Sequence, residues 1–128
     1  MNTRVSSPSR TMLLSKLHRV TVTEAVLNYE GSCGIDEDLL DAADMKEYER
    51  IELYNVTNGE RFDTYIIKAE RGSGTISLNG AAARRAQVGD LLIICTYGAI
   101  AAENIDRHLP KIVLATAANR VKAIRTLR

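Results

Sequence analysis

Two runs of alternating residues on either side of an Asn-Gly pair constrain the fold of this chain most. Residues 51–56 (IELYNV) and 62–69 (FDTYIIKA) have the residue types and the period of β-strands. Thr57-Asn58-Gly59 lies between them, and Asn-Gly is a strong signal for a tight turn because both residues tolerate positive φ. The sequence therefore predicts a β-hairpin over residues 51–69.

Other short strand patterns follow one another along the chain, separated by glycine-containing turns. Residues 17–23 alternate between two faces, and the same period of two continues to Gly31. Asp36 is predicted to cap a short helix over residues 37–43. Further strands are predicted at residues 75–78, 91–97 and 111–116, with an alanine-rich half-turn or short helix after Asn79-Gly80. Six or so short strands with one or two short helices favour a mainly β protein, a small closed barrel.

The length of 128 residues leaves room for one domain with one core. Residues 1–11 are rich in Ser, Arg and Asn without periodicity, so we expect a disordered N-terminal extension. The barrel is expected to occupy residues 12–117. Residues 118–128 form a basic C-terminal tail, expected to be helical or frayed.

Charge and hydropathy exclude several classes of partner. The formal net charge is +1 at pH 7, which is too small to attract nucleic acid or an anionic membrane. No apolar run approaches the roughly 18 residues of a spanning helix, and the N-terminus lacks the apolar core of a secretory signal. We expect a cytoplasmic protein whose two cysteines, Cys33 and Cys95, are free thiols. The two His and two Cys have no recognisable metal-ligand spacing, so no metal site is predicted.

The dipeptide Gly31-Ser32 follows the first extended segment. Gly-Ser marks an ordinary turn in most soluble proteins. A second interpretation is a peptide bond that cleaves itself, since a serine hydroxyl can attack the carbonyl before it and convert the amide into an ester. Glycine would tolerate the distorted backbone that such an attack needs. The dipeptide alone does not decide between the two.

Four uninterrupted blocks give the dipeptide a context. They read KLHRVTVTEAVLNYEGSCGID, NVTNGERFDTYII, ERGSGTISLNGAAA and VGDLLII, and together they resemble the pyruvoyl-dependent aspartate 1-decarboxylases from about residue 12 to about residue 116. The resemblance implies cleavage between Gly31 and Ser32, which leaves a pyruvoyl group derived from Ser32 at the start of the new chain. Such a ketone forms a Schiff base with a substrate amine and accepts the electrons released at the α-carbon.

The same resemblance implies a substrate, a fold and an assembly. The substrate would be L-aspartate, converted to β-alanine and CO2 for pantothenate and coenzyme A synthesis. The fold would be a six-stranded double-psi β-barrel, and the assembly a homotetramer. The sequence leaves open whether cleavage is spontaneous or uses a separate maturation protein, and which subunit supplies each residue of the site.

Individual residues of the matching blocks take roles from the family. Arg61 would grip the retained side-chain carboxylate with two parallel hydrogen bonds, and Lys16 would also contact a substrate carboxylate. Tyr65 would protonate the α-carbon after decarboxylation. Thr64 would stabilise the oxyanion at Gly31 during self-cleavage and contact the substrate. Asn79 would bind the substrate imine, and the backbone of Gly80, Ala81 and Ala82 the substrate carboxylate. Taken without the family, Lys16 and Arg61 would be solvated charges and Tyr65 a half-buried core residue.

Two readings from other classes stay open at this point. Cys33 with His18 and Asp36 would form a cysteine hydrolase, although that requires a lowered thiol pKa and an aligned base. Alternatively, a non-catalytic small barrel would act as an interaction module through its basic tail and Arg84-Arg85. Outside the hydrolase reading, His18 is expected to support the site from behind the residues that touch substrate.

Overall fold

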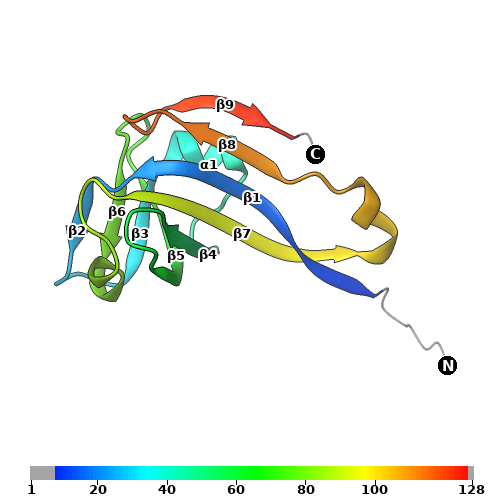
Figure 1. The fold of residues 1–128 in the computed structure, drawn as a ribbon, viewed down its shortest axis with the longest axis horizontal. Helices are drawn as coiled ribbons and strands as arrows, with labels where there is room; N and C mark the ends of the chain where they lie inside the picture. Colours follow the sequence, from blue (N-terminus) through cyan, green and yellow to red (C-terminus); the bar gives the residue numbers. More distant parts are fainter. Residues whose placement is uncertain (1–7, 127–128) are drawn as a thin grey trace.

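The computed structural model describes residues 8–126 and is mainly β, as the sequence predicts. Figure 1 shows the long strands β1 and β7 side by side across the molecule, with α1 beside β8 and the short strands β2, β3 and β6 gathered at one end. No helix in the described part of the chain is long and apolar enough to cross a membrane. The strands are β1 (Ser9–Thr21), β2 (Glu24–Val26), β3 (Ser32–Asp36), β4 (Arg50–Asn55), β5 (Arg61–Ala69), β6 (Ile76–Asn79), β7 (Leu91–Ala101), β8 (Lys111–Ala115) and β9 (Val121–Arg125), and the helices are α1 (Glu37–Ala43) and the 3-10 helices η1 (Gly80–Arg84) and η2 (Ala102–Arg107).

The nine strands hydrogen-bond in the order β2-β6-β3-β5-β4-β7-β1-β8-β9. This is three strands more than the barrel expected from the sequence. Strands β2 and β9 lie at the two ends of this order, and within residues 8–126 no strand pairing joins them. The mainly β class is confirmed, whereas closure into a six-stranded barrel does not appear in the order of the described strands.

The predicted hairpin is confirmed. Strands β4 and β5 pair antiparallel, with Tyr54 opposite Arg61 and Arg50 opposite Tyr65. The side chain of Asn55 shapes the turn, because its Oδ1 accepts hydrogen bonds from the backbone N–H groups of Thr57 (2.9 Å) and Asn58 (3.2 Å).

Helix α1 forms where the sequence places it and closes one side of the core. Asp36 caps it, because its Oδ1 accepts a 2.8 Å hydrogen bond from the backbone N–H of Asp38. The helix buries Leu39, Leu40 and Ala43. They pack into one cluster with the inward-facing residues of the strands, whose largest fully buried members include Leu17, Ile35, Ile51, Leu53, Ile66, Ile76, Leu78, Leu92 and Ile94.

The expected disorder of residues 1–11 is wrong for residues 9–11. Ser9, Arg10 and Thr11 belong to β1 and pair with Ala101, Ile100 and Ala99 of β7. Their polar composition does not indicate a strand, because the hydrogen bonds that form it come from a partner strand far away in the sequence. Residues 1–7 lie outside the part that the structure describes.

The basic tail, expected to be helical or frayed, likewise contains a strand, at Val121–Arg125. Strand β9 pairs antiparallel with β8. The turn before it is held by Asn119, which is buried and has φ +59. Its side chain accepts a hydrogen bond from the Thr21 N–H (2.7 Å) and donates to the carbonyls of Thr21 and Gly74 (2.8 Å each). These contacts tie residues 118–126 to β1 and to the turn before β6.

Candidate functional site

Ser32 is the first residue of β3, and its side chain is only 2% exposed. In the antiparallel pair of β3 and β6 it lies opposite Asn79. The Asn79 side-chain amide donates a 2.9 Å hydrogen bond to Ser32 Oγ, and Ser32 Oγ lies 3.5 Å from the Glu30 carbonyl oxygen, to which it donates. The hydroxyl is therefore fixed and shielded from solvent, directly after the Gly31 carbonyl.

Gly80 packs against the chain that leads into Ser32. It has φ +66, and a Cβ there would lie 2.9 Å from both Gly31 Cα and the Tyr29 carbonyl oxygen. Only glycine fits this approach, because such contacts are shorter than a Cβ tolerates. Gly31 itself does not have positive φ, and a Cβ added to it would meet nothing within 4 Å. The close approach therefore requires glycine at position 80, while the fold gives no steric reason for glycine at position 31.

Arg61, Thr64 and Tyr65 all come from β5, the strand on the other side of β3 from β6. Thr64 lies opposite the buried Ile51, and Tyr65 opposite the exposed Arg50, so the two residues point to opposite faces of the sheet. The β4–β5 register has no shift over this stretch, and the strand is regular. Over this stretch of β5, therefore, no register shift brings Thr64 and Tyr65 to the same face.

Strand β5 nevertheless brings Tyr65 close to the level of Ser32. The parallel pairing of β3 and β5 sets Cys33 opposite Ile66, one residue beyond Ser32 and Tyr65 in each strand. Tyr65 is 38% exposed, and its ring centre lies 6.5 Å from that of Tyr48. The Tyr65 side chain is therefore partly exposed and lies near the start of β3.

The remaining predicted contacts divide into two groups. Gly80, Ala81 and Ala82 form the start of η1 immediately after Asn79, with Gly80 and Ala82 buried. Lys16 lies on β1, between Cys95 of β7 and Ile112 of β8. In the strand order, three strands separate β1 from β3. The structure thus brings η1 to Ser32 but does not bring Lys16 there by strand pairing.

The cysteine hydrolase reading is wrong. Cys33 is fully buried in the core, and burial raises the pKa of its thiol to about 12. Asp36 is already used by the helix cap and by the backbone N–H groups of Gly72 and Gly74. A thiol that stays protonated, without a free carboxylate to orient a base, does not supply a nucleophile.

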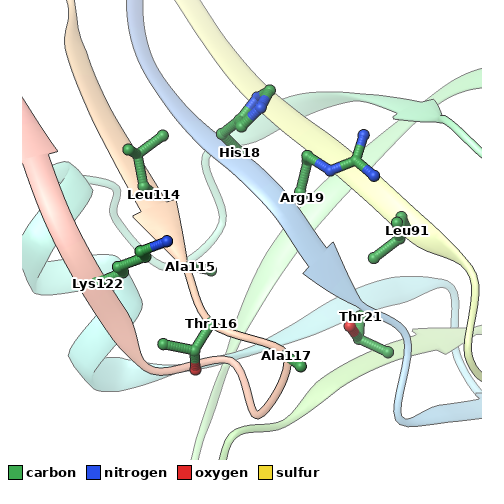
Figure 2. Close-up of a pocket in the computed structure, with 9 residues that line it drawn as sticks. All are labelled: His18, Arg19, Thr21, Leu91, Leu114, Ala115, Thr116, Ala117 and Lys122. Carbon is green, nitrogen blue, oxygen red and sulfur yellow. The ribbon is translucent and has the colours of Figure 1, made fainter.

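His18 lines the cavity drawn in Figure 2, together with residues from β1, β8 and β9. The cavity holds about 370 Å³ and contains none of the other residues predicted for the site. Burial, followed by the charges of Lys16, Arg19 and Arg125, lowers the pKa of His18 below 6.5. Its buried Nδ1 has no hydrogen-bond partner among residues 8–126. His18 therefore lies in a cavity that does not include Ser32.

Sequence reasoning missed two features of this region. The contact between Asn79 and Ser32 depends on pairing β3 with β6, which no local pattern shows. The second feature is the contact of Arg61 with Tyr54: the central carbon of the guanidinium lies 3.9 Å from the centre of the Tyr54 ring. The Asn58-Gly59 pair did not signal this second contact, because a two-residue turn there would set Tyr54 opposite Asp63. In the observed register the Asn55 N–H bonds to the Glu60 carbonyl oxygen, and Tyr54 lies opposite Arg61.

Comparison with known proteins supplies the family. The sequence profile of the aspartate decarboxylase family matches residues 9–122. The chain is 78% identical to the aspartate 1-decarboxylase of Bordetella avium over 116 residues, which is 91% of this chain and 95% of that protein. It is 71% identical to the aspartate 1-decarboxylase of Ralstonia pickettii (91% and 97% covered) and 70% identical to that of Cupriavidus necator (91% and 97%). The resemblance seen in the four sequence blocks is confirmed, and the chain belongs to the aspartate decarboxylase family.

Proposed function

We propose that this protein is an L-aspartate 1-decarboxylase that makes its catalytic group from Ser32 and releases β-alanine and CO2. The observation that carries the proposal is the buried Ser32 hydroxyl, held by Asn79 directly after the Gly31 carbonyl. A surface Gly-Ser turn would leave the hydroxyl in water. The family membership and the relatives named aspartate 1-decarboxylase support the same substrate.

The residues around Ser32 fit a pyruvoyl group at that position. The group is no larger than the serine that it replaces, Asn79 supplies a hydrogen-bond donor 2.9 Å from the Ser32 oxygen, and the burial of residue 32 excludes water. When present, a pyruvoyl group takes up the substrate amine and accepts the electrons released with CO2.

Self-cleavage uses the chain's own atoms and one water. Ser32 Oγ attacks the Gly31 carbonyl carbon, the amide becomes an ester, and loss of the Ser32 α-proton releases Gly31 as a carboxylate. The dehydroalanine left at residue 32 tautomerises to an imine, and water hydrolyses the imine to the ketone with release of ammonia. Thr64, on the neighbouring strand β5, donates a hydrogen bond to the oxyanion that develops on Gly31. The close approach of Gly80 to Gly31 supports attack at the Gly31 carbonyl, because it holds the segment that carries this carbonyl against η1.

Substrate binding and turnover fall to other residues. Arg61 holds the side-chain carboxylate of aspartate, and the backbone of Gly80, Ala81 and Ala82 contacts a substrate carboxylate. Tyr65 delivers a proton to the α-carbon after CO2 has left. Asn79, placed against Ser32 Oγ, would turn its amide to the substrate once Ser32 has been converted.

Lys16 bears on the assembly. Three strands lie between β1 and β3 in the sheet order, so a neighbouring copy is the natural source of a Lys16 amine at Ser32. Exposed Val26, Leu27 and Tyr29 lie just before the cleavage site and leave an apolar surface for such a copy. The proposal includes a homotetramer in the cytoplasm that serves pantothenate and coenzyme A synthesis. The six-stranded double-psi β-barrel of the family would be formed by part of the nine-stranded order, and a maturation protein is left open.

The test is an intact-mass spectrum followed by an activity assay. Processed wild type should give residues 1–31 and a second fragment from residue 32, roughly 17 Da lighter than hydrolysis would give because an amine has become a ketone. Ser32→Ala should stay whole and inactive. Arg61→Ala should be processed but lose about a hundredfold in kcat/KM. A whole wild-type chain after long incubation with cell extract, or an active Ser32→Ala protein, would refute the proposal.

A further inference from the structure

The guanidinium of Arg61 lies over an aromatic ring on the adjacent strand. Its central carbon is 3.9 Å from the centre of the Tyr54 ring, and the two residues are opposite one another in the β4–β5 register. Cross-strand partners share one face of the sheet. At this distance the cation is attracted by the negative face of the ring, and the contact restricts where the guanidinium can lie.

The ring of Tyr54 is itself held at its far end. The hydroxyls of Tyr54 and Tyr97 are 2.7 Å apart, and Tyr97 comes from β7, the strand on the other side of β4. The hydrogen bond with Tyr54, followed by burial, raises the pKa of Tyr97 above its ordinary value. The Tyr97 phenol therefore stays protonated at neutral pH, and the hydrogen-bonded pair fixes the ring on which Arg61 rests.

The acidic side chains around Arg61 are occupied by other cations. Glu60, its neighbour in sequence, pairs with Arg85 at 2.6 Å. Asp63 and Glu52 both pair with Arg50, at 3.2 Å and 3.0 Å. No salt bridge joins Arg61 to any acidic group in residues 8–126. Stacking covers one face of the guanidinium and leaves its edge, which carries the N–H donors, free for a carboxylate from outside the chain.

We infer that Tyr54, held by Tyr97, is a positioning residue that orients the Arg61 guanidinium for the side-chain carboxylate of the substrate. The inference rests on the proposed role of Arg61. It adds that recognition depends on a three-strand chain of contacts, from Arg61 on β5 through Tyr54 on β4 to Tyr97 on β7. Neither tyrosine touches the substrate. A guanidinium without this support would sample many orientations, and a two-point grip requires one of them.

The test uses processed protein and the split between KM and kcat. Tyr54→Leu removes the ring and should raise KM for aspartate about 5- to 30-fold, with kcat within about threefold and processing complete by mass. Tyr54→Phe and Tyr97→Phe each keep the Tyr54 ring and break the same hydrogen bond between the two hydroxyls. Both should raise KM by the same smaller factor, about two- to threefold. They are the matched controls that separate the effect of the ring from that of the hydroxyl.

A double-mutant cycle separates orientation of Arg61 from general damage. In the Arg61→Ala background, Tyr54→Leu should have no further effect on kcat/KM, because the group that it orients is gone. Equal losses in both backgrounds, or an unchanged KM in Tyr54→Leu, would overturn the inference while leaving the proposed function intact. If Tyr54→Leu does not fold, the decision passes to Tyr97→Phe, whose unchanged KM would also overturn it. A processed wild type that does not decarboxylate aspartate would instead refute the proposed function.

Discussion

The Asn79 side-chain amide donates a 2.9 Å hydrogen bond to Ser32 Oγ across the β3–β6 pair. The bond occupies one lone pair of the serine oxygen and holds the side chain in one rotamer. The hydroxyl hydrogen is then directed to the Glu30 carbonyl oxygen, 3.5 Å away. We therefore propose that Asn79 holds the Ser32 hydroxyl before cleavage and that its amide becomes available to the substrate only afterwards.

The first prediction is that Asn79→Ala slows self-cleavage. Removing the donor lets the Ser32 side chain rotate away from the Gly31 carbonyl, and a lost hydrogen bond of about 1–3 kcal/mol corresponds to a rate lowered about 5- to 100-fold. The measurement is the half-time of chain cleavage by intact mass. Ser77→Ala is the matched control, because Ser77 is buried two residues earlier on the same strand. Equal half-times for the two variants would remove Asn79 from processing.

The second prediction concerns the close approach of Gly80 to Gly31. In Gly80→Ala, the new Cβ would lie 2.9 Å from Gly31 Cα, so the segment before Ser32 must move, and we expect a largely uncut chain. Gly89→Ala is the matched control, since Gly89 has φ +93 but open space around it and experiences backbone strain alone. Thermal unfolding of both variants checks that they fold. Normal cleavage in a folded Gly80→Ala protein would contradict the steric argument.

Local patterns predicted the elements of this fold better than their pairing. The Asn58-Gly59 turn and the Asp36 cap depend on neighbouring residues, and both are found where the sequence puts them. The strand at residues 9–11 depends instead on Ala99–Ala101, about 90 positions away, and Asn119 acts on Thr21 and Gly74. Such partners leave no periodic signal.

The candidate site divides in the same way. Gly31 and Ser32 were identified from a motif that lies within one segment, and Arg61 and Tyr65 from another. Their relation in space follows from the parallel pairing of β3 with β5, which a sequence pattern cannot specify. The contact of Tyr54 with Arg61 likewise depends on the observed register of β4 and β5, because a two-residue turn at Asn58-Gly59 would have set Tyr54 opposite Asp63.

The third prediction separates forming the catalytic group from using it. Thr64 and Tyr65 lie on opposite faces of β5, and we expect them to have different functions. Thr64→Val keeps the shape but lacks the hydroxyl that we propose stabilises the oxyanion at Gly31, so the chain should remain whole. Tyr65→Phe should be cut normally and then lose about 10²–10⁴-fold in turnover, the usual contribution of a general acid.

Borohydride trapping distinguishes these two variants. In the presence of aspartate, the reagent should attach substrate to the fragment that begins at residue 32 in Tyr65→Phe and leave Thr64→Val unlabelled. A fully processed Tyr65→Phe protein with wild-type turnover would show that another group delivers the proton. Cleavage of Thr64→Val at the wild-type rate would remove Thr64 from processing.

The fourth prediction concerns Asp36, whose carboxylate joins α1 to the turn before β6. Burial alone would raise its pKa, but hydrogen bonds from the backbone N–H groups of Gly74, Asp38 and Gly72, together with the charge of Arg120, outweigh burial and lower the pKa below 3.8. Because the unfolded chain has the higher pKa, it binds the proton more tightly. The stabilisation is therefore complete well above pH 4 and is lost as pH falls through the folded-state pKa.

Asp36→Asn tests this linkage, because it keeps the shape but removes the charge and one acceptor. At pH 7 we expect the free energy of unfolding to fall by about 2–3 kcal/mol, since three hydrogen bonds to a charged group are weakened. Urea titrations in the Ser32→Ala background, at fixed protein concentration, keep the chain in one piece. The difference in unfolding free energy between Asp36→Asn and its Asp36 parent should narrow below about pH 4, as the parent's carboxylate is protonated.

Asp41→Asn is the control, because Asp41 is an exposed acid of the same helix, paired with Arg71 at 2.8 Å. This substitution should change stability by less than about 1 kcal/mol. A gap between Asp36→Asn and its parent that stays constant from pH 7 to pH 3 would show that the charge of Asp36 does not stabilise the fold.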